Sequence, residues 1–455
     1  MATRGHHLLT ADRGFATGGG WLGRLVAPAF ARLLDQFDAR LLVGGFDCAL
    51  PDGSRRRIGF HAPGPVAVVT LHSWACLARL AFSGSVGWYK AWEKGEWSSP
   101  DPVPLFELFI ANAVSLGDTA RAKGPARWVN ALVHRLRDNA PGQARDNIAA
   151  HYDLGNDFYA AWLDEGMTYS SGRFPAPPAR AGGVDSAKLS GGGHVVLHED
   201  KPSPSALRAS SPPAMAGGAL EAAQARKIDA LLDRLDLSPG DRLLEIGCGW
   251  GSLAIAAAKR GAHVTGLTLS SEQKQWADAR IAEAGLAGRI DIRLQDYRAV
   301  TETYDAIVSV EMVEAVGERW WPTYLDTIAS SLKPGGRAAL QFISIDHRLF
   351  DDYAASADFI QAYIFPGGML IDEPRFVALA AARGLVWQDR DGFGQDYAET
   401  LRLWRERYDA AVRRGDLAGF DERFHRLWRY YLMYCEGGFR GRGIDVAQVT
   451  LTKAA

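Results

Sequence analysis

The sequence predicts an α/β protein with a doubly wound parallel sheet, preceded by a smaller α+β domain. From Arg242 onward, apolar runs of strand length alternate with segments of helical periodicity, which is the pattern of βαβ units. Between about Phe37 and Lys123, short apolar runs are separated by Gly and Pro clusters at 50–53 and 60–65 before a helical segment begins. At 455 residues, the chain is long enough for two or three domains.

The elements of the larger part follow one another in chain order. A helical pattern over 219–235 is followed by a Leu-Ser-Pro-Gly stop. Strands are predicted at 242–247, 263–269, 290–295, 304–310 and 337–343, with helices at 252–260 and 270–285. Beyond Asp346 the chain is expected to become helical and aromatic.

Two segments lack apolar periodicity. Residues 1–30 are expected to form a flexible amino terminus. Residues 175–219 are rich in Pro, Gly, Ser and Ala, and we expect a disordered surface insertion there. These boundaries predict an α+β domain at 31–140 and a larger domain at 141–455.

Composition excludes several classes of protein. The 51 Lys and Arg against 53 Asp and Glu leave a formal net charge of −2, which disfavours a dedicated nucleic-acid binder. Polar residues interrupt the longest apolar stretch, Ala67 to Phe82, so no membrane-spanning helix is expected. The first twenty residues lack the apolar core of a signal peptide, and the four cysteines are widely spaced. We therefore expect a cytoplasmic protein without a disulfide framework and without a metal site.

A glycine run follows the first predicted strand of the larger domain and opens a helix. Gly247, Gly249 and Gly251 are spaced G-x-G-x-G after Glu245, so the backbone can turn sharply and approach a ligand closely. A side chain at any of the three is expected to occupy ligand space. The second strand ends in 268–270 without the carboxylate that a dinucleotide-dependent dehydrogenase uses for the ribose.

This run resembles the first motif of class I S-adenosylmethionine (SAM)-dependent methyltransferases. Further segments resemble the cyclopropane-fatty-acyl-phospholipid synthases and the related mycolic acid cyclopropane synthases, from about residue 145 to the end, except for the insertion. The matching segments are 151–159, 167–170, 268–273, 363–368, 430–435 and 439–440. Residues 87–97 and 104–109 are also similar to the amino-terminal domain of the longer bacterial members. The resemblance implies a class I methyltransferase, Rossmann-like doubly wound sheet with helical additions for a lipid site.

The resemblance implies transfer of the SAM methyl group to the double bond of an unsaturated acyl chain of a membrane phospholipid. The resulting carbocation would lose a proton and close to a cyclopropane. The enzyme would touch the inner membrane surface transiently, and the small domain is a candidate for lipid or homodimer contacts. By the same resemblance, the cofactor-binding residues are Tyr169, Ser170, Glu245, Gly247, Gly249, Gly251, Thr268, Ser270, Gln273, Gln295, Asp296 and Tyr297.

A bound bicarbonate accepts the proton in relatives, and the resemblance assigns its site to five residues. These are Glu314, Ile343 and Tyr397, together with Ser171 and Gln341, which stand where many relatives have Cys and His. Gln cannot become cationic or relay a proton as imidazole can, so bicarbonate binding and ring closure stay open. Glu311 is expected to be a solvated carboxylate at a helix start. Cys435 matches a family cysteine once considered catalytic, but a structural thiol is favoured because alkene methylation needs no sulfur nucleophile.

Three functions remain open. The first is cyclopropane formation, the second is methylation of the acyl chain without ring closure, and the third is non-catalytic lipid binding on a methyltransferase fold. The arginines between 402 and 442 could face anionic headgroups, although a salt-bridged solvated face is favoured because Asp and Glu are interleaved with them.

Overall fold

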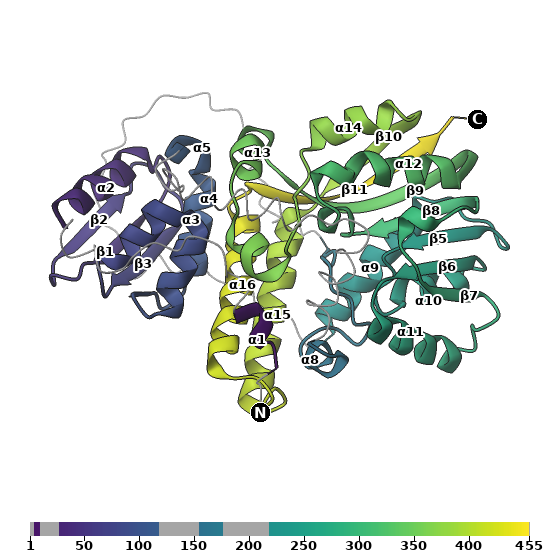
Figure 1. Cartoon of the computed structure of the whole chain (residues 1–455), viewed down its shortest axis with the longest axis horizontal. Helices are drawn as coiled ribbons and strands as arrows, with labels where there is room; N and C mark the ends of the chain where they lie inside the picture. Colours follow the sequence, from purple (N-terminus) through teal and green to yellow (C-terminus); the bar gives the residue numbers. More distant parts are fainter. Residues whose placement is uncertain (1–3, 10–26, 118–153, 176–217, 455) are drawn as a thin grey trace, which may run out of the picture.

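The computed structural model describes residues 4–9, 27–117, 154–175 and 218–454. The small amino-terminal domain lies at one end of the molecule and the large sheet at the other (Figure 1). Two long helices, α15 (Gly394–Arg414) and α16 (Glu422–Arg440), stand between them. The expected insertion falls largely on residues outside the described ranges.

The small domain is an α+β unit. Its sheet has the order β2-β1-β3-β4, in which β1 and β3 are parallel and the other pairs antiparallel. Its elements are α2 (Ala27–Arg40), β1 (Gly45–Ala49), β2 (Arg55–Gly59), β3 (Val66–Leu71), α3 (Ala75–Glu93), β4 (Trp97–Ser98), α4 (Val103–Ala111) and α5 (Ala113–Leu116). Gly84 breaks the helical dihedrals of α3, with φ 57° and ψ −137°, which glycine tolerates.

The amino terminus differs from the expectation of a flexible segment. The short helix α1 (His6–Leu9) buries Leu8 and Leu9 in the core. Beside it, Arg4 forms an ion pair with Asp157, with 2.6 Å between Nη2 and Oδ1. Apolar burial therefore holds residues 4–9 in place, while residues 10–26 lie outside the described ranges.

The large domain has a seven-stranded sheet of order β10-β11-β9-β8-β5-β6-β7, in which β5 to β9 are parallel. This topology confirms the class I methyltransferase fold. Its strands are β5 (Arg242–Ile246), β6 (His263–Thr268), β7 (Ile290–Leu294), β8 (Tyr304–Val310), β9 (Leu332–Ile345), β10 (Leu385–Gly392) and β11 (Ile444–Lys453). Its helices, besides α15 and α16, are α8 (Asn156–Ala160), α9 (Ala219–Asp233), α10 (Ser252–Lys259), α11 (Ser271–Glu283), α12 (Trp321–Ser331), α13 (His347–Ala354) and α14 (Glu373–Ala381). Short 3₁₀ turns η3 (Tyr297–Ala299), η4 (Val313–Ala315) and η5 (Glu318–Trp320), and the π-turn η6 (Ile360–Ile364), connect them.

Two strands lie beyond Asp346, where only helices were expected. β11 is antiparallel and fits between β9 and β10. Five of the eight residues of β10 are exposed, so no apolar alternation marks that strand. β11 does alternate apolar and polar residues over 449–452, which is a strand signal, but the buried Gln448 interrupts the pattern before it.

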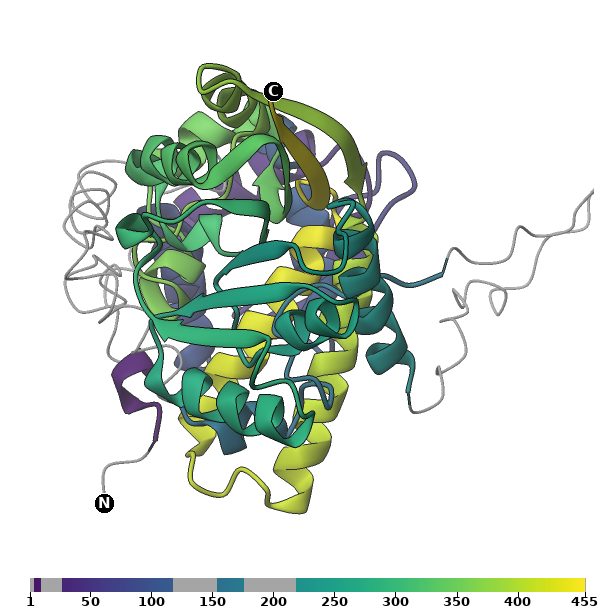
Figure 2. The same cartoon turned by 90° about the vertical axis from the view of Figure 1, so that its right-hand side faces the viewer.

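Separate apolar clusters cover the two faces of the sheet. One contains Trp321, Ile328 and Phe376 from α12 and α14, and the other contains Leu232 and Leu253 from α9 and α10. A view onto the large domain shows α15 and α16 behind the strands (Figure 2). A parallel sheet buried on both faces leaves the carboxyl ends of its strands as the place for a ligand site.

The two domains meet where α4 packs against α16. A Cβ atom at Gly437 would overlap Phe106, and one at Gly441 would overlap Ile110. Two glycines spaced by four residues lie on one face of a helix, so they form a groove that admits α4 at close range. The small domain is thus packed directly against a helix of the large one.

Candidate active site

A cavity of about 580 Å³ joins the carboxyl ends of the strands to the small domain. At one end it is lined by Gly249, Asp296 and other residues of the predicted cofactor loops. At the other end it is lined by Ser85 of α3, and by Ile110 and Ala113 of α4 and α5. Glu311, Glu314, Tyr397 and Cys435 line the stretch between them.

The glycine loop has the left-handed backbone that its spacing predicts. The φ angles of Gly247, Gly249 and Gly251 are 84°, 50° and 85°. At Gly249 no described atom lies within 4 Å of the position that a Cβ would take, so a side chain there would enter the cavity. At Gly247 and Gly251 a Cβ would instead crowd Met312 and Ala277, at 2.9 Å and 3.1 Å. The prediction of ligand space is therefore wrong at Gly251, which does not line the cavity, and stays a prediction at Gly247, which does.

The segment after β6 is held by its own hydrogen bonds. Thr268 Oγ1 donates to Gln273 Oε1 over 2.8 Å, and Gln273 N donates to Ser270 Oγ over 3.2 Å. Ser270 is the N-cap of α11, and its side chain does not line the cavity, whereas Thr268 and Gln273 do. Thr268 and Gln273 remain candidates for the ribose contact, and Ser270 fixes the helix behind them.

The segment after β7 also lines the cavity. Asp296 receives two hydrogen bonds from the Arg298 guanidinium, at 2.9 Å and 2.6 Å, and Gln295 Nε2 donates to Ala299 O over 3.0 Å. Tyr297 is buried, and its ring packs edge-on against Tyr324. Because Arg298 donates to the Asp296 carboxylate, only the remaining lone pairs of Asp296 can accept a hydrogen bond from an adenine amino group.

A buried lysine that the sequence did not single out lies beside the cofactor loop. Lys227 Nζ of α9 donates to Ser170 Oγ over 2.7 Å. Burial lowers the pKa of Lys227 to about 8, and burial raises the pKa of Glu245 to about 8, while each charge partly offsets the other's shift. Glu245 Oε2 is buried without a hydrogen-bond partner among the described residues, as expected for an acceptor that a bound cofactor would satisfy. Tyr169 Oη, nearby, lies 2.7 Å from Tyr431 Oη.

Glu311 occupies the centre of the predicted bicarbonate site. Its carboxylate accepts hydrogen bonds from the Ser171 N–H (2.9 Å), Gln341 Nε2 (2.7 Å) and Tyr397 Oη (2.6 Å). The expectation of a solvated carboxylate is therefore wrong: three of the five groups assigned to bicarbonate hold this side chain instead. The backbone of Glu311 has φ 49°, an uncommon conformation for a residue with a side chain, and such strain is typical of functional sites.

Ser171 contributes its backbone and not its hydroxyl. Its Oγ donates to Gly172 O over 2.9 Å, so the side chain is turned away from the carboxylate. The substitution of Ser for the Cys of many relatives therefore changes no contact to Glu311.

Glu314 and Ile343 form a second pair. The Ile343 N–H donates to Glu314 Oε1, and the other carboxylate oxygen is buried without a partner among the described residues. Burial, together with the nearby Glu311, raises the pKa of Glu314 to about 8. Burial also raises the pKa of Glu311, but the hydrogen bonds from Tyr397, Ser171 and Gln341 and the charge of Lys227 oppose that shift. At neutral pH, Glu314 is mainly protonated, whereas the three hydrogen-bond donors and Lys227 favour the charged form of Glu311.

Cys435 lines the cavity from α16. Burial raises the pKa of its thiol far above the ordinary value, with a smaller contribution from Asp358. A protonated thiol is a poor nucleophile, so Cys435 is a wall of the cavity and not a reactive group.

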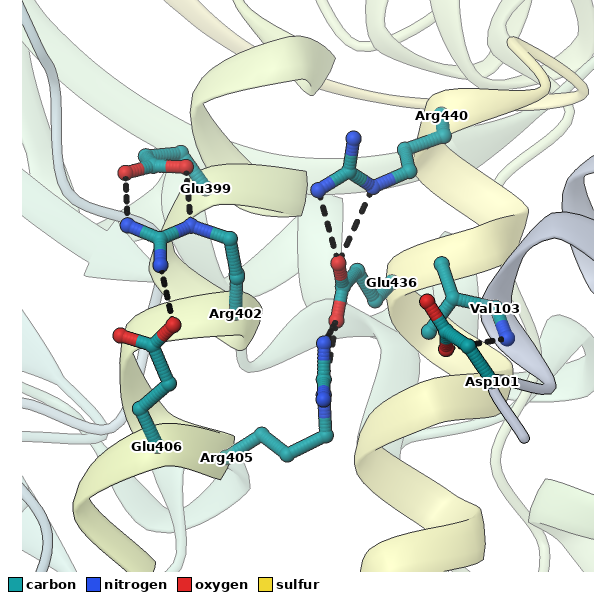
Figure 3. Close-up of polar contacts among 8 residues, drawn as sticks. All are labelled: Asp101, Val103, Glu399, Arg402, Arg405, Glu406, Glu436 and Arg440. Atoms are coloured by element: carbon teal, nitrogen blue, oxygen red, sulfur yellow. Dashed lines mark hydrogen bonds and ion pairs between the residues drawn. The ribbon is translucent and has the colours of Figure 1, made fainter. Parts of the chain in front are cut away.

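The arginines of α15 and α16 that Figure 3 shows are paired with carboxylates. Arg405 and Arg440 both bind Glu436, at 3.0 Å and 2.8 Å, and that glutamate is 1% exposed. Arg402 bridges Glu399 and Glu406, and Asp101 accepts from the Val103 N–H where α4 starts. Arg405 joins α15 to α16, and the other two arginines pair within their own helices, which favours the salt-bridged face over a headgroup site.

The comparisons with known proteins agree with this geometry. The family model described as mycolic acid cyclopropane synthetase matches residues 140–191 and 213–449. The chain is 39% identical to the tuberculostearic acid methyltransferase UfaA1 of Mycobacterium tuberculosis, over 83% of this chain and 81% of the relative. It is 35% identical to the cyclopropane-fatty-acyl-phospholipid synthase of Escherichia coli, over 82% of this chain and 85% of the relative.

Solved structures show the same architecture. The cyclopropane synthase MmaA2 of Mycobacterium tuberculosis superposes with a TM-score of 0.54 at 27% identity, over 68% of this chain and 98% of that one. The mycolic acid cyclopropane synthase CmaA1, solved with S-adenosylhomocysteine (SAH) and CTAB, superposes with the same score, identity and coverage.

Proposed function

The chain belongs to the mycolic acid cyclopropane synthetase family of SAM-dependent methyltransferases, and from this premise we propose that it methylates the double bond of an unsaturated acyl chain with Glu311 as the proton acceptor. SAM is the methyl donor of this family. The observation that carries the proposal is the Glu311 carboxylate, held by Ser171, Gln341 and Tyr397 where bicarbonate was expected. It puts a base that is part of the chain itself in the cavity.

The chemistry needs that base only after methyl transfer. The alkene π electrons form the new C–C bond while the donor's C–S bond breaks, which leaves a positive charge on the substrate. Loss of a C–H proton to the Glu311 carboxylate then neutralises the chain, and the C–H electron pair forms a new C=C or C–C bond. A preorganised anion beside the developing charge also stabilises the transition state. The cavity walls must supply the alignment, because an alkene has no proton to remove beforehand.

The cavity suits an acyl chain. Its lining area is mainly apolar, with Phe106, Phe109, Ile110, Leu349 and Phe365 among the walls. The relative CmaA1 was solved with CTAB, and the relative UfaA1 is named a tuberculostearic acid methyltransferase. We propose a phospholipid acyl chain as substrate, reached by transient contact of a cytoplasmic enzyme with the inner membrane surface. No helix in the described part of the chain is long and apolar enough to span a bilayer.

We propose that the product is a methyl-branched chain that keeps a C=C bond, without ring closure. The tethered carboxylate and Gln341, in place of bicarbonate and His, change the surroundings of the leaving proton. One relative that supports this choice is named a methyltransferase. A relative at 35% identity is named a cyclopropane synthase, so the product itself must be measured.

The test combines product analysis with removal of bicarbonate. Purified enzyme, SAM and vesicles of an unsaturated phospholipid, in buffer freed of carbon dioxide, should yield chains heavier by one CH₂ that retain olefinic or methylene proton signals. Glu311→Gln should reduce turnover by about 100-fold or more, because general bases contribute on that order, while SAM affinity stays unchanged. Glu318→Gln, an exposed glutamate bound to Arg375, serves as the matched control and should be fully active.

Three outcomes would overturn parts of the proposal. A cyclopropane product would overturn the branched product. Activity that disappears without bicarbonate and returns with it would overturn Glu311 as the base. SAM binding without methyl transfer to any unsaturated lipid would point to non-catalytic lipid binding.

A further inference from the structure

We propose that Gln448 and Arg173 are positioning residues, which keep Glu311 ionised and oriented through a one-way chain of hydrogen-bond donors from Arg173 through Gln448 and Gln341 to Glu311. The inference rests on the proposed function only for the role of Glu311 as proton acceptor. Gln448 and Arg173 do not line the cavity, so they act on the reaction only through other residues.

The chain of hydrogen bonds from Arg173 to Glu311 is continuous in the structure. Arg173 Nη1 donates to Gln448 Oε1 over 3.2 Å, and Gln448 Nε2 donates to Gln341 Oε1 over 3.0 Å. Gln341 Nε2 then donates to Glu311 Oε1 over 2.7 Å. Gln448 and Gln341 face each other in the β9–β11 register and are 0% and 1% exposed, so water does not compete for these bonds.

The direction of donation is fixed by Arg173, at the end of the hydrogen-bond chain farthest from Glu311. A guanidinium can only donate, and Arg173 is joined there by Arg234, whose Nε lies 3.4 Å from the same oxygen of Gln448. The Gln448 NH₂ group must therefore point inward, where it also donates to Lys227 O over 3.3 Å. Gln341 consequently presents its oxygen to Gln448 and its NH₂ group to the carboxylate. Each amide has one orientation that satisfies all its partners.

This arrangement favours the charged form of Glu311. Donors stabilise a carboxylate more than a carboxylic acid, and successive buried hydrogen bonds polarise one another. The positive charge of Arg173 stands at the far end of this hydrogen-bond chain, where the guanidinium forms an ion pair with Asp391 at 2.5 Å. The amides cannot pass a proton onward as imidazole can, so the chain holds the charge of Glu311 but offers no proton exit.

Other groups also face Glu311 and must stay constant in a test. They are the Tyr397 hydroxyl from α15, the Lys227 ammonium from α9 and the Glu314 carboxyl from η4. Tyr397 and Lys227 favour the charged form, and an ionised Glu314 would oppose it. Gln448→Leu keeps the side-chain volume roughly constant and removes the central link without touching any of the three side chains.

The test measures the ionisation of Glu311 directly in the full-length protein. Difference infrared spectroscopy across a pH titration follows the carboxyl bands, and the band lost in Glu311→Gln identifies this residue. Gln448→Leu should move the titration midpoint upward by about one pH unit, a tenfold gain in proton affinity. Arg173→Met should produce a smaller upward shift because Arg234 remains, and Arg173→Lys should largely restore the original midpoint. Thr452→Val alters a residue on the same strand whose hydroxyl binds Gln388 and no member of the hydrogen-bond chain, so it should leave the midpoint unchanged.

Activity gives an independent readout. In Gln448→Leu, turnover near neutral pH should fall and then recover as pH rises, with unchanged SAM affinity. An unshifted midpoint, or a loss of turnover that is equal at every pH, would overturn the inference. If Gln448→Leu does not fold, the comparison of Arg173→Met with Arg173→Lys decides the question at a partly exposed position. A shifted midpoint in an enzyme whose wild type transfers no methyl group would leave this inference standing and overturn the proposed function.

Discussion

Glu311 and Glu314, three positions apart, have different electrostatic surroundings at the centre of the cavity. Glu311 has three hydrogen-bond donors, whereas Glu314 has the Ile343 N–H and one oxygen without a partner among the described residues. Environments that separate the pKa values of neighbouring carboxyl groups assign them different chemical roles. In the proposed mechanism Glu311 is the base, and Glu314 is a neutral neighbour that does not compete for the proton at neutral pH.

The neutral state of Glu314 predicts a pH-dependent stability. Its unfolded form ionises above about 4.5, while the folded form holds the proton until about pH 8. Unfolding therefore releases a proton in this window, and this residue's contribution to stability falls as pH rises from about 5 to about 8. Glu314→Gln has no carboxyl group to ionise on unfolding, so it does not lose stability in this way. The melting temperature of the variant minus that of the wild type should therefore increase from about pH 5 to about pH 8 and level off above it. Thermal melts at several pH values check this, and a constant difference would contradict it.

Gly249 and its neighbours in the loop should respond differently to a side chain. Gly249→Val points into open cavity and should abolish SAM binding while the protein stays folded, although its φ of 50° adds some strain. Gly251→Val meets Ala277 and should lower the melting temperature instead. Calorimetric SAM titrations and thermal melts of both variants distinguish the two effects. Normal SAM affinity in Gly249→Val would exclude this loop as the cofactor site.

At the scale of elements, α16 makes different contacts through three of its faces. One presents Tyr431, Cys435 and Phe439 to the cavity. A second carries Glu436, which binds Arg405 of α15. A third consists of Gly437 and Gly441 against α4. Residues four apart share a helix face, so one helix can serve the site, its neighbour and the other domain at once.

The glycine face of α16 predicts a compensating pair of substitutions. Gly441 has an ordinary helical φ of −75°, so Gly441→Val is unfavourable because its Cβ strikes α4, where it overlaps the Ile110 side chain and lies 2.7 Å from Glu107 O. Overpacking of this kind costs about 1–3 kcal/mol. Adding Ile110→Ala should recover part of the loss, which double-mutant denaturation measures. Strict additivity of the two losses would show that these helices do not contact each other in solution.

At the scale of the whole molecule, the small domain supplies one end of the cavity. Ala113 of α5 lines that end, whereas Ala111 of α4 is exposed. Ala113→Phe should shift turnover toward shorter acyl chains, and Ala111→Phe, the matched control, should not. Competition between phospholipids of different chain lengths, with product analysis, measures the shift. An unchanged preference would mean that the acyl chain does not reach the small domain.

The sequence predicts the features that are encoded locally. The glycine loop, the strands from β5 to β9 and their helices depend on neighbouring residues, and these predictions are confirmed. The role of Glu311 depends on Ser171, Gln341 and Tyr397, which are 140, 30 and 86 residues away. Gln448 and Lys227 are buried polar residues, and such residues look like surface positions until their partners are known.

The position of β11 has a consequence for how the protein must be made. Both neighbours of this strand, β9 and β10, precede it in the chain, so the sheet keeps an open slot until residues 444–453 have been synthesised. Two strands then expose unpaired edges, which are templates for pairing with other chains. Insertion of β11 closes both edges and in the same step brings Gln448 against Gln341. The edges of β9 and β10 thus stay open to pairing with other chains until β11 is in place.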